Sequence, residues 1–215
     1  MKKLRILCLH GYRGSARTLQ DQMKPLVSDS ESLVEYIAID APTLTSGDFS
    51  WWRAVADKSS AVSADPGVNP APKHYKGWTR TRELLESVFA ERGPFDGVFG
   101  FSQGAALTGL LVGLRASDGL LTKDKPLSFG FAILVGGFTS NDPNHAALYS
   151  SSESYSLPSL HLIGLADSIV PSEVSQRLAA KFTNPTLALH SGGHVIPSTP
   201  EIREQYGAFL AAFAG

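Results

Sequence analysis

Short apolar runs recur along the chain, and longer stretches between them carry apolar residues at every third or fourth position. The short runs have the length and composition of buried strands, whereas the longer stretches have a helical period. The runs predict strands at Leu4–Leu9, Val34–Ile39, Gly97–Phe101, Phe129–Val135, Leu160–Ile163 and Thr186–Leu189. The longer stretches predict helices at Ser15–Val27, Thr79–Arg92, Gln103–Arg115, Ser172–Phe182 and Pro200–Phe213.

The order of these elements predicts the fold class. Strands that alternate with helices form parallel βαβ units. Several strands are apolar throughout, as in Ala132 to Val135, which strands covered by helices on both faces require. We therefore expect an α/β fold with a doubly wound, mainly parallel sheet of about six strands and helices on both faces. The length of 215 residues suits a single domain, residues 1–215, without a separate cap domain.

The charge and the cysteine content indicate which classes of partner and which cellular compartment to expect. The formal net charge is -1, and no Lys- or Arg-rich run offers a basic surface to a polyanion, so nucleic acid is not an expected partner. No segment approaches the roughly eighteen apolar residues that a membrane span needs. The single cysteine, Cys8, lies in the first apolar run, which predicts a buried thiol in a reducing compartment. A cytoplasmic location is therefore expected.

One short motif carries the strongest chemical signal. Gly100-Phe101-Ser102-Gln103-Gly104 fits the Gly-x-Ser-x-Gly nucleophile elbow. A predicted strand ends at Phe101 and a predicted helix begins at Gln103, so Ser102 would lie on a tight turn in a strained backbone conformation. The start of a helix also offers free N–H groups to a developing anion. We expect Ser102 to be a nucleophile; an ordinary Gly/Ser loop is the alternative interpretation.

A nucleophilic serine needs an adjacent base and a third group that orients the base. Asp167 lies in the loop after the strand at 160–163, and His194 lies in the loop after the strand at 186–189. In a parallel sheet, loops that leave the carboxyl ends of the strands meet at one edge. The chain order of serine, aspartate and histidine is the order expected of an α/β-hydrolase. Ser102, Asp167 and His194 are therefore the candidate catalytic residues.

Other residues could fill two of these roles. His190 closes a predicted strand and His161 lies within one, and His194 is favoured over both because two glycines precede it. Asp142 competes with Asp167 because it also follows a strand. Asp167 could instead be a solvated side chain or a helix cap.

The turn after the first strand has a predicted role in binding the oxyanion. It reads Leu9-His10-Gly11-Tyr12-Arg13-Gly14-Ser15, and in an α/β-hydrolase the corresponding loop donates one backbone N–H. Tyr12 is the expected donor, together with the N–H of Gln103. Alternatively, the turn only allows the first helix to begin.

Two segments break the pattern of strands and helices. Residues 43–77 contain two tryptophans and a Pro- and Gly-rich stretch, so this segment is expected to be irregular and to lie near the active site. Residues 139–157 predict a surface loop with one short helix. Five apolar residues near the predicted catalytic edge are candidates for an acyl pocket: Trp51, Trp52, Phe138, Ile169 and Val195.

The chain resembles the FSH-type family of small serine hydrolases, within the α/β-hydrolase superfamily. The resemblance rests on four blocks of sequence: Leu9 to Tyr12, Gly93 to Ala106, Gly164 to Pro171 and Gly193 to Pro197. It implies a minimal α/β-hydrolase fold and carboxylic-ester hydrolysis by Ser102, Asp167 and His194. It also implies that no metal or organic cofactor is needed. Some members of the family resemble thioesterases that release acyl or polyketide chains from carrier proteins.

These observations together predict a serine hydrolase that cleaves carboxylic esters through an acyl-enzyme. The expected partner is a small-molecule acyl ester or thioester. The sequence leaves the oligomeric state open. A thioesterase is the first alternative. A binding protein that keeps the α/β-hydrolase fold without catalysis is an alternative of a different class, and a peptidase would share the triad.

Overall fold

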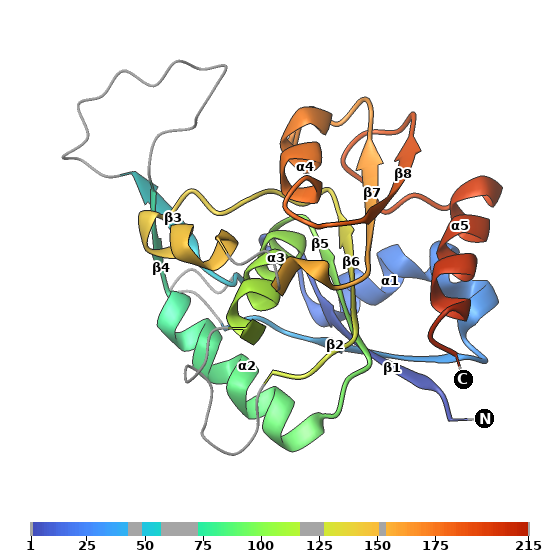
Figure 1. Cartoon of the computed structure of the whole chain (residues 1–215), viewed down its shortest axis with the longest axis horizontal. Helices are drawn as coiled ribbons and strands as arrows, with labels where there is room; N and C mark the ends of the chain where they lie inside the picture. The colour runs from blue at the N-terminus through green and yellow to red at the C-terminus, as the bar shows by residue number, and fades with distance from the viewer. Residues whose placement is uncertain (1, 43–48, 57–72, 117–126, 151–153, 215) are drawn as a thin grey trace.

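A single six-stranded sheet organises the chain (Figure 1). The computed structural model describes residues 2–42, 49–56, 73–116, 127–150 and 154–214. Every neighbouring pair in the sheet is parallel, and the strand order is β2-β1-β5-β6-β7-β8. The strands are β1 (Leu4–Leu9), β2 (Val34–Ile39), β5 (Gly97–Phe101), β6 (Phe131–Val135), β7 (Ser159–Gly164) and β8 (Pro185–His190). The predicted fold class is confirmed.

Helices cover both faces of the sheet. On one face lie α1 (Ala16–Val27) and α5 (Pro200–Ala211), and the other carries α2 (Trp78–Arg92), α3 (Gln103–Ala116) and α4 (Ser172–Ala179). The side chain of Ser15 caps α1 by accepting the N–H of Thr18 at 3.1 Å, as its position before the helix favours. No helix within the described ranges is long and apolar enough to cross a bilayer.

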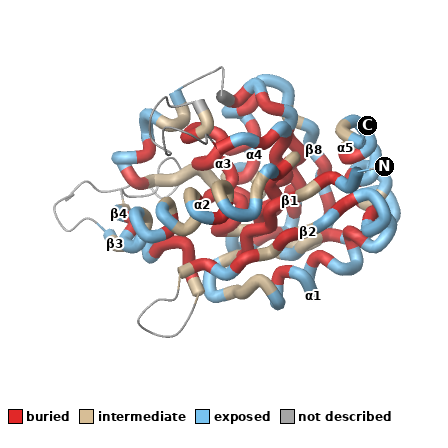
Figure 2. The backbone as a smooth tube through the Cα atoms, turned by 90° about the horizontal axis from the view of Figure 1, so that it is seen from below, coloured by how far each residue is buried: buried red, intermediate tan, exposed pale blue. Residues whose placement is uncertain are grey.

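Each face of the sheet has its own hydrophobic core. The tube in Figure 2 shows the buried positions concentrated in the strands and on the inner sides of the helices. Strands β5, β6 and β7 are buried at every position, which explains their uninterrupted apolar sequences. On the α1 and α5 face, the ring of Phe131 packs against Phe213, with 4.4 Å between the ring centroids.

The segment predicted to be irregular, residues 43–77, contains two short strands. Arg53–Ala56 (β3) and Lys73–Lys76 (β4) pair in an antiparallel ribbon outside the main sheet. Their sequences escape a search for apolar runs because each strand has only four residues, is largely exposed and begins with a charged residue. Residues 43–48 and 57–72, which include the Pro- and Gly-rich stretch, lie outside the described residues.

Residues 139–157 also differ from the predicted surface loop. They form the 3₁₀ helices η2 (Pro143–Tyr149) and η3 (Ser154–Ser156). Tyr155 is buried, and its hydroxyl donates to the carbonyl oxygen of Gly109 in α3 at 2.9 Å. The segment therefore packs onto α3, because an aromatic ring in the middle of a polar stretch contributes to the core.

Candidate active site

Three loops at the carboxyl edge of the sheet bring a hydroxyl, an imidazole and a carboxylate together. Ser102 follows β5, Asp167 follows β7 and His194 follows β8. Nε2 of His194 lies 2.8 Å from Oγ of Ser102, and Nδ1 lies 2.6 Å from Oδ2 of Asp167. The three side chains form one continuous hydrogen-bonded chain, although Ser102 and His194 are 92 positions apart in the sequence.

Ser102 lies in a strained turn between β5 and α3. Its φ of 55° lies in the left-handed region, which non-glycine residues rarely adopt. The turn is held by the N–H of Ser102, which donates to the carbonyl oxygen of Val135 at 2.8 Å. A Cβ atom on Gly104 would lie 2.0 Å from the carbonyl oxygen of Leu9, and one on Gly100 would lie 2.3 Å from that of Gly104. Both glycines of the motif are therefore required by close backbone packing.

Asp167 is held as a buried carboxylate. Its Oδ1 accepts the N–H groups of Ile169 at 2.9 Å and Val170 at 2.8 Å, which leaves Oδ2 for His194. Burial raises the pKa of Asp167, but the two N–H groups and the His194 ring together outweigh burial and lower the pKa below its ordinary value. An ionised Asp167 accepts the proton of His194 Nδ1 and leaves Nε2 as the acceptor that faces Ser102.

Of the alternative residues, His161 and Asp142 have partners elsewhere. Burial in β7 lowers the pKa of His161 to about 3, and its Nε2 lies 3.1 Å from Oγ of Ser159. Burial also lowers the pKa of His190. The carboxylate of Asp142 accepts the N–H of Tyr75 at 2.7 Å and that of Asn144 at 3.0 Å. Asp142 therefore ties β4 to η2, while Asp167 contacts His194.

The turn after β1 lies directly against the serine. A Cβ atom on Gly11 would be 3.3 Å from Cβ of Ser102. The N–H of Arg13 donates to the carbonyl oxygen of Phe49, and that of Gly14 donates to the carbonyl oxygen of Gly11. Tyr12 lies between these bonded positions and lines the same cavity as Ser102 and Gln103. Gln103 is the first residue of α3, so its N–H has no acceptor within the helix.

Ser102 opens into a cavity of about 960 Å³. This is at the upper end of the range for small-molecule sites, so the cavity can hold a substrate considerably larger than an acetyl ester. Trp52, Phe138 and Ile169, three of the five residues predicted for the pocket, line it. Its walls come from β3, β4, α4 and the loops that follow β1, β6 and β7.

Trp51 and Val195, also predicted for the pocket, do not line this cavity. The side chain of Trp51 has 0% exposure, and its Nε1 donates to the carbonyl oxygen of His10 at 2.7 Å. The ring thus belongs to the core beneath the turn after β1. Val195 follows His194 and is 52% exposed. An apolar residue close to a catalytic edge in sequence can point into the core or into solvent, and the sequence alone does not separate these cases.

The side chain of Gln103 has a role that the sequence did not predict. Its Oε1 accepts the N–H of Trp51 at 3.1 Å and the hydroxyl of Ser50 at 3.2 Å, and its Nε2 donates to the carbonyl oxygen of Trp52 at 2.9 Å. The residue after the serine therefore anchors residues 50–52 to the elbow. The only signal in the sequence was an amide side chain at a motif position that accepts any residue.

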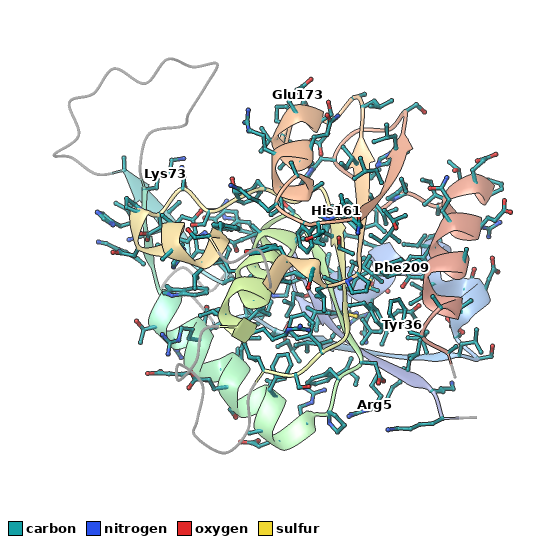
Figure 3. The ribbon with its side chains drawn as sticks, viewed as in Figure 1. Arg5, Tyr36, Lys73, His161, Glu173 and Phe209 are labelled. Atoms are coloured by element: carbon teal, nitrogen blue, oxygen red, sulfur yellow. The ribbon has the colours of Figure 1, made fainter. Side chains whose placement is uncertain are left out.

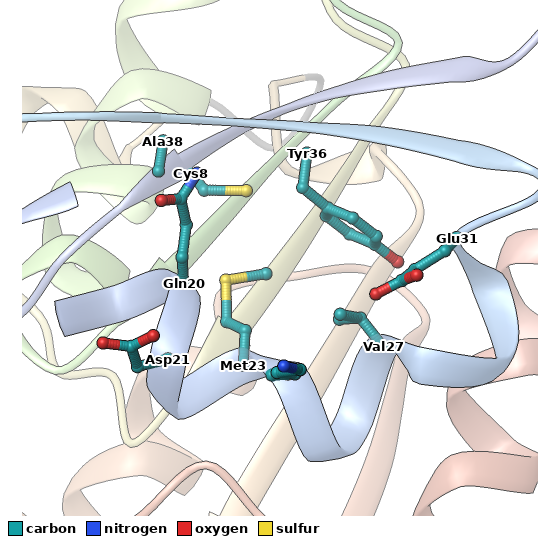
Figure 4. Close-up of a pocket in the computed structure, with 9 residues that line it drawn as sticks. Cys8, Gln20, Asp21, Met23, Val27, Glu31, Tyr36 and Ala38 are labelled. Carbon is teal, nitrogen blue, oxygen red and sulfur yellow. The ribbon is translucent and has the colours of Figure 1, made fainter. Parts of the chain in front are cut away.

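A second, smaller cavity lies between α1 and the first two strands, away from the three candidate residues (Figure 4). Its volume is about 250 Å³, and Cys8, Met23 and Tyr36 are among its lining residues. Burial raises the pKa of the Cys8 thiol, which makes it a poor nucleophile. Within the described part of the chain, no group of three or more His, Cys, Asp or Glu side chains is arranged to hold a metal ion.

Comparison with known proteins gives matches over almost the whole chain. A family model described as serine hydrolase (FSH1) matches residues 1–206. Esterase CG5412 of Drosophila melanogaster is 34% identical over 219 residues, which cover 97% of this chain and 74% of that protein. Esterase OVCA2 of Xenopus tropicalis is 32% identical over 226 residues, which cover 98% and 93%. The crystal structure of Zea mays acyl-protein thioesterase 2 superimposes with a TM-score of 0.71 at 23% identity and covers 100% of this chain and 95% of that chain.

Proposed function

Because this chain belongs to the FSH1 family of serine hydrolases, we propose that it cleaves carboxylic esters through an acyl-enzyme on Ser102. His194 is the general base and Asp167 orients it. The observation that carries the proposal is the hydrogen-bonded chain from Ser102 Oγ through the His194 ring to Asp167 Oδ2. The names of the two relatives, both esterases, favour an ester as the substrate.

Acylation begins when Ser102 Oγ attacks the carbonyl carbon of the ester. His194 Nε2 takes the proton from the hydroxyl, and the charge that develops on the ring is stabilised by the carboxylate of Asp167. The carbonyl oxygen becomes an oxyanion, which the backbone N–H groups of Tyr12 and Gln103 stabilise. His194 then protonates the leaving alcohol, the C–O bond to the alcohol breaks, and the acyl group stays on Ser102.

Deacylation repeats the same steps with water as the nucleophile. His194 takes a proton from the water as the oxygen attacks the acyl carbon, and it returns that proton to Ser102 Oγ when the acid leaves. The enzyme is thereby restored without a cofactor in either half-reaction. The same geometry accepts a thioester, because only the leaving group differs.

Substitution of the nucleophile and the base tests the triad. We expect Ser102→Ala and His194→Ala each to lower kcat on a 4-nitrophenyl ester by roughly 10⁴ to 10⁶, as in other triads. Thermal unfolding of both variants checks that they are folded. Near-normal turnover by a folded Ser102→Ala protein would end the proposal.

A fluorophosphonate probe separates an enzyme from a binding protein with the same fold. We expect the probe to label the wild-type protein at Ser102 alone, as located by peptide mass spectrometry, and to leave Ser102→Ala unlabelled. Parallel assays with an ester, a thioester and an amide of the same acyl group then rank the substrates. Amide turnover comparable with ester turnover would indicate a peptidase instead.

A cytoplasmic location remains part of the proposal. It is supported by Cys8, which is a buried free thiol in the structure and would persist in a reducing compartment. Fractionation of cells that express the full chain checks it, and recovery in a secreted or membrane fraction would contradict it.

A further inference from the structure

The walls of the active-site cavity carry several positive charges. Arg53, Lys73, Arg177 and Lys181 line the cavity, and no Asp or Glu is among the described residues that line it. The whole chain has a formal net charge of -1, so this excess is local. Like charges gathered in one cleft repel each other when the cleft is empty, and they attract an anion into it.

Two of the cations come from α4 and the turn that follows it: Arg177 lies in the last turn of the helix and Lys181 lies just after its end. Val174 and Arg177 share a side of α4, and Lys181, in the turn after the helix, continues the spacing of three and four residues; all three line the cavity. The adjoining side is anchored. Leu178 is fully buried, and the hydroxyl of Ser175 donates to the carbonyl oxygen of Gly137 at 2.8 Å. The helix therefore holds the charged side over the cavity.

A third cation comes from the β3–β4 ribbon. Directly opposed residues of an antiparallel pair share a face, so Lys73 lies on the same face as Tyr75 and its partner Ala54. All three line the cavity. The ring of Tyr75 is stacked on Trp52 with 4.6 Å between centroids, which fixes this face of the ribbon. Figure 3 shows Lys73 at the start of β4.

Three described carboxylates belong to the segments that wall the cavity, and none of the three lines it. Asp142 accepts two backbone N–H groups, and Asp167 is bound to His194. Glu173 stands in the first turn of α4 (Figure 3) and does not line the cavity. Among the residues that the structure describes, none of the four cations forms an ion pair with a carboxylate.

We propose that the substrate carries an anionic group, a carboxylate or a phosphate, which the cavity binds through Arg177, Lys181 and Lys73 while its acyl carbon lies at Ser102. The inference rests on the proposed function, because it assigns a substrate class to the same site. Trp52, Phe138 and Ile169 add apolar surface to the same cavity. A substrate with an apolar part and an anionic part matches this mixed lining.

The first test compares two esters that differ in one charge. Adipic acid mono-4-nitrophenyl ester has a carboxylate at the far end of the acyl chain, and 4-nitrophenyl hexanoate has a methyl group there. We expect kcat/KM to be roughly 3- to 10-fold higher for the adipate ester at low ionic strength. The preference should shrink as salt screens the charges.

The second test places the anion on the leaving group. Hexanoyl-4′-phosphopantetheine and hexanoyl-pantetheine share the acyl chain and the thioester and differ only in the phosphate. A preference for the phosphorylated thioester alone assigns the anion to the leaving group, whereas a preference for the adipate ester alone assigns it to the acyl chain. Either result supports an anion-binding wall, and no preference in either pair would overturn it.

Variants locate the preference in the charged wall. We expect Arg177→Gln combined with Lys181→Gln to bring the preferred anionic substrate to within about twofold of its neutral counterpart, because both side chains are exposed and their loss removes only charge. Arg92→Gln is the matched control: Arg92 is an exposed cation in the last turn of α2, which leads to the amino end of β5. An unchanged ratio in the double variant would overturn the proposal.

Binding without turnover separates this inference from the proposed function. Calorimetry with Ser102→Ala measures the affinity for the adipate ester and for the hexanoate ester directly. If the wild-type protein hydrolyses neither ester but the anion is still bound more tightly, the proposed function fails and the anion-binding wall stands. If both esters are hydrolysed at equal rates and bound with equal affinity, the wall fails and the hydrolase stands.

Discussion

Two aspartates of this chain have similar surroundings in sequence and different partners in space. Asp142 and Asp167 both follow a strand of the sheet, and each accepts two hydrogen bonds from backbone N–H groups through its carboxylate. The difference is that Asp167 uses a single oxygen for both, so its second oxygen is available to His194. The sequence ranked Asp167 first but could not exclude Asp142, because a carboxylate's partners depend on the direction in which its loop leaves the sheet.

Paired substitutions test this difference at the residue scale. We expect Asp167→Asn to lower kcat by roughly 10⁴-fold, because an amide no longer selects the tautomer with Nε2 free to take the Ser102 proton. Asp142→Asn should lower kcat by less than about tenfold and act mainly on stability. Steady-state kinetics and urea unfolding of both variants check the prediction. A larger loss of kcat in Asp142→Asn than in Asp167→Asn would show that Asp142, and not Asp167, orients the base.

At the scale of elements, the sequence predicted the strands and helices that have a clear local pattern. The strands of the main sheet are recognisable because each is a short apolar run, and β1, β2 and β5 have the predicted bounds. The ribbon of β3 and β4 was missed, because its two strands have only four residues each and lie on either side of sixteen residues that are outside the described part of the chain. Non-local pairing of half-exposed strands leaves little trace in sequence.

The charged face of α4 was visible in the sequence but not interpretable there. The spacing of Val174, Arg177 and Lys181 places them on one side of a predicted helix, and charged helix faces usually point to solvent. Only the position of the ribbon, whose Lys73 and Tyr75 line the same cavity, shows that this side faces a cleft. Likewise, the sequence does not show which of Trp51 and Trp52 lines the cavity. The structure does, because Nε1 of Trp51 donates to the carbonyl oxygen of His10 and keeps that ring in the core.

A histidine within β7 makes the stability of the sheet depend on pH. His161 is buried, and its pKa falls from the ordinary 6.5 to about 3. In the unfolded chain, His161 is therefore protonated below about pH 6.5, whereas in the folded protein it stays neutral down to about pH 3. This difference favours unfolding progressively as the pH falls from 6.5 toward 3.

Replacement of His161 by Gln removes that titration. We expect the free energy of unfolding of His161→Gln to decline less between pH 7 and pH 4.5 than that of the wild-type protein, as measured by urea unfolding at several pH values. His10, His145 and His190, whose pKa values are also lowered by burial, remain in both proteins and give a common background. Parallel declines in the two proteins would refute the assignment.

At the scale of the whole molecule, the candidate catalytic residues and the packing around α5 occupy different parts of the fold. Ser102, Asp167 and His194 lie at the carboxyl edge of the sheet, whereas Phe131 begins β6 at the amino edge and packs on Phe209 and Phe213. Figure 1 shows α5 and the chain termini at the side of the sheet away from the β3–β4 ribbon. Damage to the α5 packing should therefore affect folding more than catalysis.

Phe131→Leu tests this separation. We expect it to lower the free energy of unfolding by about 1–2 kcal/mol, a part of the 3–5 kcal/mol that full truncation of a buried phenylalanine costs. Its kcat at a temperature where it stays folded should match the wild-type value. Phe209→Leu, at a partly buried position on α5, is the matched control and should cost less. A large fall in kcat without unfolding would show that the two regions are coupled.

The side chain of Gln103 connects the turn that holds Ser102 to one wall of the cavity. This one amide forms hydrogen bonds with Ser50, Trp51 and Trp52. The next residues form β3, which belongs to the ribbon that lines the cavity. A library that randomises Ala54 and Tyr75 would reshape the cavity and leave the hydrogen bonds of Gln103 intact. We expect substitution of Gln103 to change both specificity and rate. Residues 50–52 and Gln103 should therefore be kept together when the cavity is redesigned.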